Sequence, residues 1–213
     1  MSSLCCGWNY ASNHFSDEDG RIIVICKDPL KVQVLQQSAQ QLTCQVQLPA
    51  SAPFYYTAIY ASNQRVDRVG LWVELLHLYQ QLNLANLPWI LGGDFNEIIH
   101  PSEHSLFEVN SISPQMAEFR DTLYKMGMFD LRFQGPLNTW SNHRPESPIS
   151  KKLDRLLVNS KTISLFPNSV ATFLPPETSD HCPSLLDLSH QLPLAGTKPF
   201  RFFNYLTKHP LFH

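Results

Sequence analysis

The stretch from Trp89 to Asn96 constrains the fold of this chain more than any other. Three apolar residues run into two glycines, and Asp94 and Asn96 follow with one residue between them. A short apolar run that starts after Pro88 and ends in glycines is typical of a strand buried on both faces. Side chains alternate along an extended chain, so Asp94 and Asn96 should point the same way at the strand end. Open α/β sheets place their chemistry at such ends.

A carboxylate beside a carboxamide suits the hydrolysis of phosphate esters. Asp94 could orient or deprotonate a water, and the amide N–H of Asn96 could stabilise charge on a transferring oxygen. The alternative is that Asp94 only caps a following helix. This stretch by itself supports both interpretations equally, and the rest of the chain decides between them.

The residues before this stretch change their period. Apolar and polar residues alternate in segments linked by short turns, which predicts a meander of antiparallel strands at 6–11, 21–26, 31–37, 41–48 and 54–60. From Val66 to Leu82 apolar residues recur at threes and fours, which predicts an amphipathic helix with Asn63 as its cap. A second helix is predicted at 115–126. The change from meander to strand–helix–strand favours a mixed α/β sandwich.

Composition sets limits on function. Hydrophobic residues make up 43% of the 213 residues and charged ones 16%, which argues for one folded domain. The net charge of -2 gives no general attraction to nucleic acid. Residues 120–161, however, hold eight Lys and Arg against four acids, a local excess of +4. This excess is either a solvated surface or the rim of a nucleic-acid site.

Cysteine use and hydropathy indicate the compartment. The five cysteines include no Cys-x-x-Cys pair, which favours reduced, buried thiols. No apolar run is long enough for a membrane span, and the N-terminus lacks the layout of a signal peptide. We therefore expect a nuclear or cytoplasmic protein that is neither secreted nor bound to a membrane. His100 and His104 have a metal-chelating spacing, but Pro101 between them favours a loop.

Five short motifs follow one another at or near predicted strand ends: Tyr60 with Asn63, Asp94 with Asn96, Thr139-Trp140, Asp154, and Asp180-His181. Each is weak alone, but in this order they resemble the endonuclease/exonuclease/phosphatase superfamily of metal-dependent phosphoesterases. The resemblance implies a four-layer α/β sandwich, in which two packed, mixed and largely antiparallel β-sheets are flanked by helices. Flanking residues are similar to the endonuclease domain of plant non-LTR (LINE-type) retrotransposons, at 92–96, 151–155, 166–167, 173–176 and 198–206.

The resemblance implies a role for each motif residue. His181 would be the general base or contact the scissile phosphate, and Asp154 would fix its tautomer. Asp94 would orient the attacking water, while Asn96 would steady that water and a phosphoryl oxygen. Asp180 would help to hold the metal. The remaining site residues would serve the substrate, with Tyr60 and Asn63 at the phosphate and Trp140, Lys151 and Lys152 in contact with nucleic acid.

The implied function is Mg²⁺-dependent nicking of DNA, with Mn²⁺ as an alternative ion. Residues 1–190 would form the domain, and 191–213 a linker and aromatic tail leading toward a lost or separate reverse transcriptase region. The family's first strand–helix–strand, with its metal-binding Glu, has no counterpart before Trp8. We therefore expect a truncated, monomeric and impaired enzyme. The alternatives are an inactive nucleic-acid-binding relic and a small-molecule or lipid phosphoesterase of the same superfamily.

Overall fold

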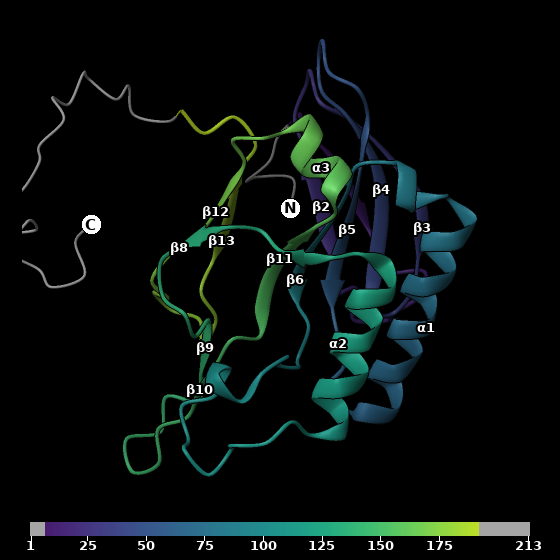
Figure 1. Cartoon of the computed structure of the whole chain (residues 1–213). Helices are drawn as coiled ribbons and strands as arrows, with labels where there is room; N and C mark the ends of the chain where they lie inside the picture. The colour runs from purple at the N-terminus through teal and green to yellow at the C-terminus, as the bar shows by residue number, and fades with distance from the viewer. Residues whose placement is uncertain (1–6, 192–213) are drawn as a thin grey trace, which may run out of the picture.

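The computed structural model describes residues 7–191, and a mixed six-stranded sheet lies at its centre (Figure 1). β5 and β6 pair in parallel, whereas the other neighbours in this sheet are antiparallel. Across the sheet the order is β3 (Lys31–Gln37), β4 (Gln41–Gln47), β5 (Phe54–Tyr60), β6 (Trp89–Asp94), β11 (Asp154–Val158) and β7 (Phe129–Asp130). The predicted central strand therefore lies between neighbours on both sides.

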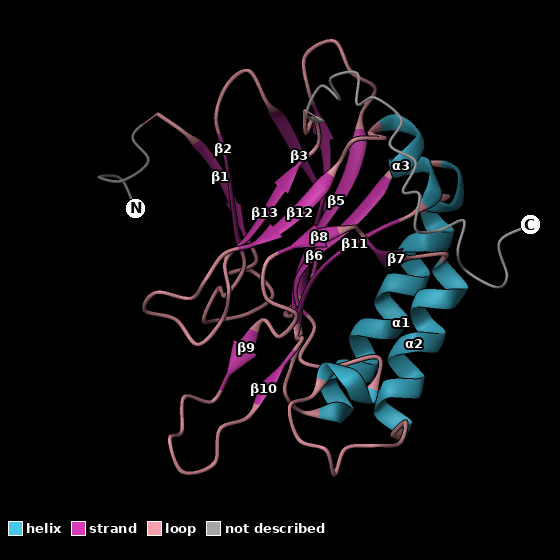
Figure 2. Ribbon diagram, turned by 60° about the vertical axis from the view of Figure 1, so that its left-hand side comes forward, coloured by secondary structure: helices cyan, strands magenta, loops and turns pink. Residues whose placement is uncertain are grey.

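Two smaller sheets form a second layer of strands (Figure 2). One pairs β1 (Asn9–Ser12) with β2 (Ile23–Cys26), and the other contains β8 (Phe133–Gln134), β12 (Val170–Phe173) and β13 (Ser184–Asp187). Side chains from both layers meet in one apolar core, which includes Ile22, Leu42, Ile90, Leu156 and Ala171. The chain thus joins its layers by packing alternate side chains of its strands inward.

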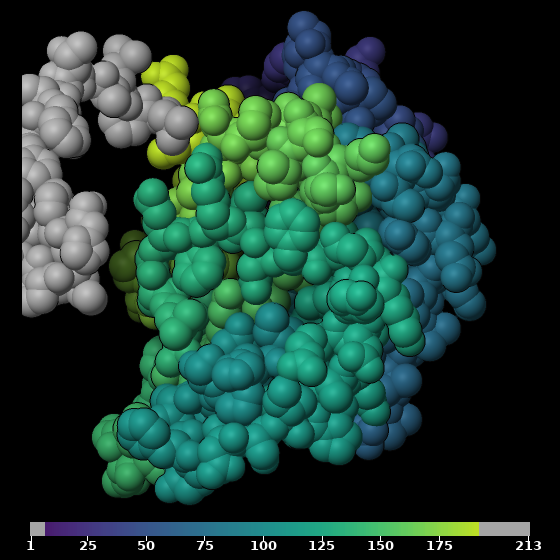
Figure 3. All heavy atoms as spheres, in the orientation of Figure 1, coloured from purple at the N-terminus to yellow at the C-terminus, as the bar shows by residue number. Residues whose placement is uncertain are grey.

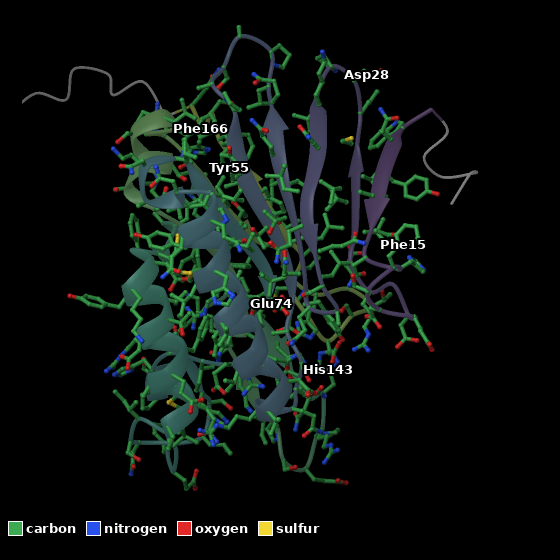
Figure 4. The ribbon with its side chains drawn as sticks, turned by 90° about the vertical axis from the view of Figure 1, so that its right-hand side faces the viewer. Phe15, Asp28, Tyr55, Glu74, His143 and Phe166 are labelled. Carbon is green, nitrogen blue, oxygen red and sulfur yellow. The ribbon has the colours of Figure 1, made fainter. Side chains whose placement is uncertain are left out.

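Helices α1 (Arg65–Gln81) and α2 (Pro114–Met126) cover the other face of the large sheet (Figure 4). Leu71 and Leu75 of α1 and Phe119 of α2 pack with Leu91 of β6 in a second apolar core. The rings of Trp72 and Phe119 stack with centroids 4.5 Å apart, which ties the two helices together. This core and the one between the sheets bury β6 from both sides, and the predicted α/β sandwich is confirmed.

The helix ends follow local chemistry. At the start of α2 the Ser113 hydroxyl accepts a hydrogen bond from the Met116 amide, and at its end Gly127 adopts a left-handed conformation with φ of 64°. The prediction that Asn63 caps α1 is wrong. Gln64 occupies the cap position, and its side chain makes no capping hydrogen bond. Short helices also occur at η1 (Leu84–Asn86), η2 (Pro101–Glu103) and α3 (Ser160–Leu165).

The glycines of β6 leave space that neighbouring groups of β5 occupy. Gly93 has φ of +136°, and a Cβ there would lie 2.0 Å from the carbonyl oxygen of Ile59. A side chain on Gly92 would meet the Tyr56 hydroxyl at 2.6 Å. Because both positions lack a Cβ, the parallel pair stays in register up to its end, where Tyr60 is the partner of Asp94.

Several other expectations concern the cysteines, the C-terminal tail and the order of the strands. Cys26, Cys44 and Cys182 are free and buried, as predicted, while Cys5 and Cys6 lie outside the described residues. The predicted tail at 198–206 also lies outside them. The predicted meander is continuous only from β3 to β5, because β1 and β2 pair apart in the second layer. None of the helices within residues 7–191 is long and apolar enough to cross a membrane.

Candidate active site

Two carboxylates meet where β6 and β11 lie side by side. The strands are antiparallel, and Asp94 at the end of β6 is the register partner of Asp154 at the start of β11. Both residues are buried, with 7% and 9% of their surface exposed. Buried carboxylates that lie this close repel each other, so their placement requires compensation from neighbouring groups.

His181 completes the cluster from a loop before β13. Its Nδ1 lies 2.9 Å from Oδ2 of Asp154, and its Nε2 lies 3.9 Å from Oδ2 of Asp94. The loop has no strand of its own at this point, and a single antiparallel bridge joins His181 to Trp140. The structure thus brings together three residues that the sequence places on separate segments.

Asn96 holds Asp94 rather than reaching for a ligand. Its backbone N–H donates to Oδ1 of Asp94 at 2.8 Å, and its side-chain amide donates to Oδ2 of Asp94 at 3.1 Å and to the carbonyl of Ala61 at 2.8 Å. Both hydrogens of the amide are therefore used inside the protein. No helix begins directly after Asp94, since the next helical turn is η2 with His100 as its cap, so the capping alternative for this carboxylate does not hold.

The electrostatics of the cluster follow from this burial. Burial raises the pKa of Asp94 to about 6, against the opposing hydrogen bond from Asn96 and with a further contribution from the charge of Asp154. The hydrogen bond to Asp154 raises the pKa of His181 above its ordinary value, and burial opposes it. A carboxyl group that titrates near neutrality beside an imidazole is a frequent property of catalytic sites.

A short hairpin forms one wall beside the cluster. It consists of β9 (Trp140–Ser141) and β10 (Ser150–Lys151), and in Figure 3 its green spheres project at the lower left. The Trp140 indole donates to Oδ2 of Asp180 at 2.9 Å, which lowers the pKa of that carboxyl. The Lys151 ammonium lies 5.9 Å from the centre of the Trp140 ring. Asp180 is exposed on this wall and is not part of the buried cluster.

Two predicted substrate contacts lie at the end of β5 and in the loop that follows it. Tyr60 is 39% exposed, and the guanidinium of Arg21 lies 5.7 Å from the centre of its ring. Asn63 is exposed in the loop between β5 and α1, and its carbonyl accepts a hydrogen bond from Arg68. Both side chains are accessible to a ligand, as a substrate contact requires.

The assignment of Lys152 to nucleic acid is wrong. Lys152 is 3% exposed, and its ammonium lies 3.2 Å from Asp130 and 4.4 Å from the centre of the Phe133 ring. Arg155 is fully buried as well, paired with Asp130 at 2.8 Å and with Glu103. Two of the cations in the +4 span are therefore buried in ion pairs with Asp130 and Glu103, and the interpretation as a solvated surface or a DNA rim applies only to the others.

Sequence reasoning missed the ion pair of Arg68 with Glu97. The Arg68 guanidinium donates to Glu97 at 2.6 Å and to the carbonyl of Ser62 at 2.8 Å, and it is almost completely buried. It thereby ties the loop after β5 to the loop after β6. A signal was present, because Arg68 stands three positions before Leu71 on the buried face of α1.

The buried cluster has the chemistry of a cation site. Among residues 7–191 the groups able to share one metal ion are Asp94, Asp154 and His181, whose ligand atoms all lie within 4.8 Å of one another. Two buried carboxylates without a full positive countercharge fit a divalent ion, and the raised pKa of Asp94 reflects the same deficit. His100 and His104 do not belong to this group.

The sequence profile of the Endonuclease/Exonuclease/phosphatase family matches residues 3–181. The chain belongs to this family. A comparison with curated protein sequences finds no significant match. The family assignment gives the buried cluster its context, because it is a family of hydrolases that act on phosphate esters. It agrees with the superfamily that the sequence motifs predicted.

Solved structures of the family share this fold at low sequence identity. The endonuclease domain of TRAS1, a telomere-specific non-LTR retrotransposon, superposes with a TM-score of 0.68 at 14% identity and covers 87% of this chain and 82% of its own. A mannosyl-6-phosphatase from Bacteroides thetaiotaomicron gives a TM-score of 0.57 at 15% identity, covering 88% and 79%. A humanised TDP2 from D. rerio gives 0.54 at 14%, covering 85% and 76%. At such identities the likeness establishes the fold.

Proposed function

We propose that this family member hydrolyses phosphodiester bonds and nicks DNA. The observation that carries the proposal is the contact of 2.9 Å between Nδ1 of His181 and the buried Asp154. With its Nδ1 proton donated to Asp154, a neutral imidazole keeps the lone pair of Nε2 on the side of Asp94. His181 is thus oriented to take a proton from a nucleophilic water.

Each remaining residue has a task within this arrangement. Asp154 fixes the ring and stabilises its charged form once the proton has been taken. Asp94, held by both donors of Asn96, orients the water beside Nε2. Mg²⁺, or Mn²⁺ in its place, would be held by the carboxylates of Asp94 and Asp154 and would supply positive charge opposite the phosphate. The resemblance also implies Asp180 as a metal ligand, but Asp180 lies on the outer wall, outside the group of side chains that can share one ion.

The retroelement context is a finer part of the same proposal. The similarity of residues 92–96 and 151–155 to plant LINE-type endonucleases supports a monomeric domain that acts on DNA in the nucleus or cytoplasm. A reverse transcriptase region of the same element would be its partner.

A small-molecule phosphoesterase is the second candidate. The fold likeness to a mannosyl-6-phosphatase, with a TM-score of 0.57, favours it. The likeness to a retrotransposon endonuclease is greater, with a TM-score of 0.68. Release of phosphate from a sugar phosphate, without any nicking of DNA, would favour the second candidate. Binding of DNA without hydrolysis of either substrate would favour the inactive relic.

The nicking of a supercoiled plasmid tests the proposal. The chain should relax the plasmid with Mg²⁺ and not with a chelator, and His181→Ala should lower the rate by about a hundredfold or more, since general base catalysis contributes this much. His190→Ala is the matched control, because His190 also faces an acid, with Nδ1 3.3 Å from Asp187, outside the site. Equal nicking by wild type and His181→Ala would refute the proposal.

A further inference from the structure

Thr139 occupies a buried position between the two halves of the Asp154–His181 pair. It precedes the hairpin strand β9 and is 1% exposed. A residue with so little exposed surface cannot be a direct contact to nucleic acid. Its polar groups must therefore find their partners inside the protein.

The side chain of Thr139 holds the carboxylate half. Its Oγ1 accepts hydrogen bonds from two consecutive backbone amides, that of Leu153 at 3.1 Å and that of Asp154 at 2.8 Å. These amides begin β11, where the backbone of Asp154 sets the direction of its carboxylate. One hydroxyl oxygen thus fixes the backbone from which that carboxylate extends.

The main chain of Thr139 holds the imidazole half. Its carbonyl accepts a hydrogen bond from the amide of Cys182 at 2.7 Å, directly after His181. Two positions after Thr139, the amide of Ser141 donates to the carbonyl of Asp180 at 3.0 Å. The loop that carries His181 is therefore attached to the hairpin through the same short segment that holds Asp154.

We propose that Thr139 is a positioning residue that sets the distance between Asp154 and His181 by binding the backbone of Asp154 and that of Cys182, the residue next to His181. This inference rests on the proposed function where it concerns the rate of hydrolysis, and on geometry alone where it concerns the imidazole. The hydroxyl oxygen is the essential atom, since a methyl group in its place leaves two buried amides without an acceptor. The end of β11 would then move away from the His181 loop.

The substitutions separate the oxygen from the shape of the side chain. Thr139→Val keeps the shape and removes the acceptor, Thr139→Ala removes both the acceptor and the methyl group, and Thr139→Ser keeps the acceptor. Thr162→Val is the matched control. Thr162 is fully buried, and its hydroxyl donates to the carbonyl of Trp89 and contacts Asn159, away from the cluster. Loss of the Thr162 hydroxyl should destabilise the fold without changing a contact of Asp154 or His181.

The first readout is the proton resonance of His181 Nδ1 in the folded chain without substrate. A proton held by Asp154 exchanges slowly and is visible far downfield. Wild type, Thr139→Ser and Thr162→Val should show it, whereas Thr139→Val and Thr139→Ala should lose it. The second readout is plasmid nicking, in which Thr139→Val should lower kcat by about a hundredfold with KM almost unchanged, as expected for a displaced catalytic group.

Three results would overturn the inference. They are a wild-type resonance in folded Thr139→Val, a lost resonance in Thr139→Ser, and a lost resonance in Thr162→Val, which would show that general destabilisation suffices. If Thr139→Val fails to fold, the Ser and Ala variants give the same decision. If wild type does not nick DNA, the proposed function fails, while the resonance still decides the positioning role.

Discussion

Asp94 has the least favourable environment of the ionisable side chains at the site. It is 7% exposed and faces Asp154, and His181, which is charged only when protonated, lies 3.9 Å away. The fold therefore holds the ionised carboxylate in a poorly solvated position, which destabilises the folded state. Residues in such positions serve chemistry at the expense of stability, which makes the cost measurable.

Replacing Asp94 by Asn should stabilise the chain at high pH. The pKa of Asp94 in the fold is about 6, above its ordinary value of 3.8. A raised pKa means that the stabilising contribution is complete below the unfolded pKa and is lost as the pH rises through the folded one. The ionised carboxylate then costs up to about 3 kcal/mol. Urea unfolding with a chelator should show a gain for Asp94→Asn at about pH 8 and little at about pH 4. An equal gain at both pH values would contradict this explanation.

The pH dependence of nicking should report His181. The base must be neutral, and the hydrogen bond to Asp154 raises its pKa above the ordinary 6.5. Activity should therefore rise with pH along a limb that lies above this value. Asp154→Asn should move the limb to lower pH and reduce the rate, since the amide no longer stabilises the imidazolium. A limb that stays in place in this variant would assign the titration to another group.

At the scale of single elements, the glycines of β6 determine how the site is built. The chain brings Tyr60 beside Asp94 only because β5 lies against a strand without side chains at two positions. Local patterns predicted β6 and α1 well, since burial and period are properties of neighbouring residues. The pairing of β8 with β12 and the separation of β1–β2 depend on distant contacts, which no local pattern contains.

Gly93→Ala should destabilise the chain by about 3 kcal/mol or more, because the new methyl group would meet the Ile59 carbonyl at 2.0 Å in a backbone conformation with φ of +136°. Gly70→Ala is the control on α1. A Cβ at Gly70 meets nothing within 4 Å, so this change should stabilise the helix by up to about 1 kcal/mol. Thermal unfolding of both variants gives the comparison. An unchanged melting temperature in Gly93→Ala would contradict this prediction and would mean that β5 and β6 separate easily.

The pair of Lys151 and Lys152 shows where site prediction failed. Neighbouring residues of an extended chain point to opposite faces, so the two lysines could not both face a substrate. Lys151 belongs to β10 on the wall beside the cluster, whereas Lys152 turns inward to Asp130. The sequence motif at 151–155 identified the right segment, but only the geometry of the strand shows that Lys151 and Lys152 point in different directions. Strand geometry is also what brings Asp94 and Asp154 together, because they are register partners in β6 and β11.

At the scale of the whole molecule, charge is distributed between core and surface. The net charge is -2, and Lys152 and Arg155 are buried in ion pairs, so neither can contact DNA. DNA binding should therefore be weak and should decrease with salt, since each neutralised phosphate releases counterions. The accessible cations of the hairpin wall should carry most of this binding.

Lys151→Ala should weaken binding to all DNA sequences about equally and reduce the salt slope by about one, because a phosphate contact carries no base code. Lys152→Met should instead lower stability, since it leaves Asp130 with one partner fewer, and should leave the salt slope unchanged. Fluorescence anisotropy at several salt concentrations separates the two effects. A loss confined to one DNA sequence in Lys151→Ala would indicate base recognition.

The contact between Asp154 and His181 has a consequence for how the protein folds. Asp154 and His181 are 27 positions apart, and β6 and β11 become partners only after helix α2 and the hairpin lie between them in sequence. Such distant pairings close late, because loop entropy opposes them until most of the chain is in place. A fragment that stops before His181 contains Asp154 but not its imidazole partner. We therefore expect the contact between Asp154 and His181 to form late in folding.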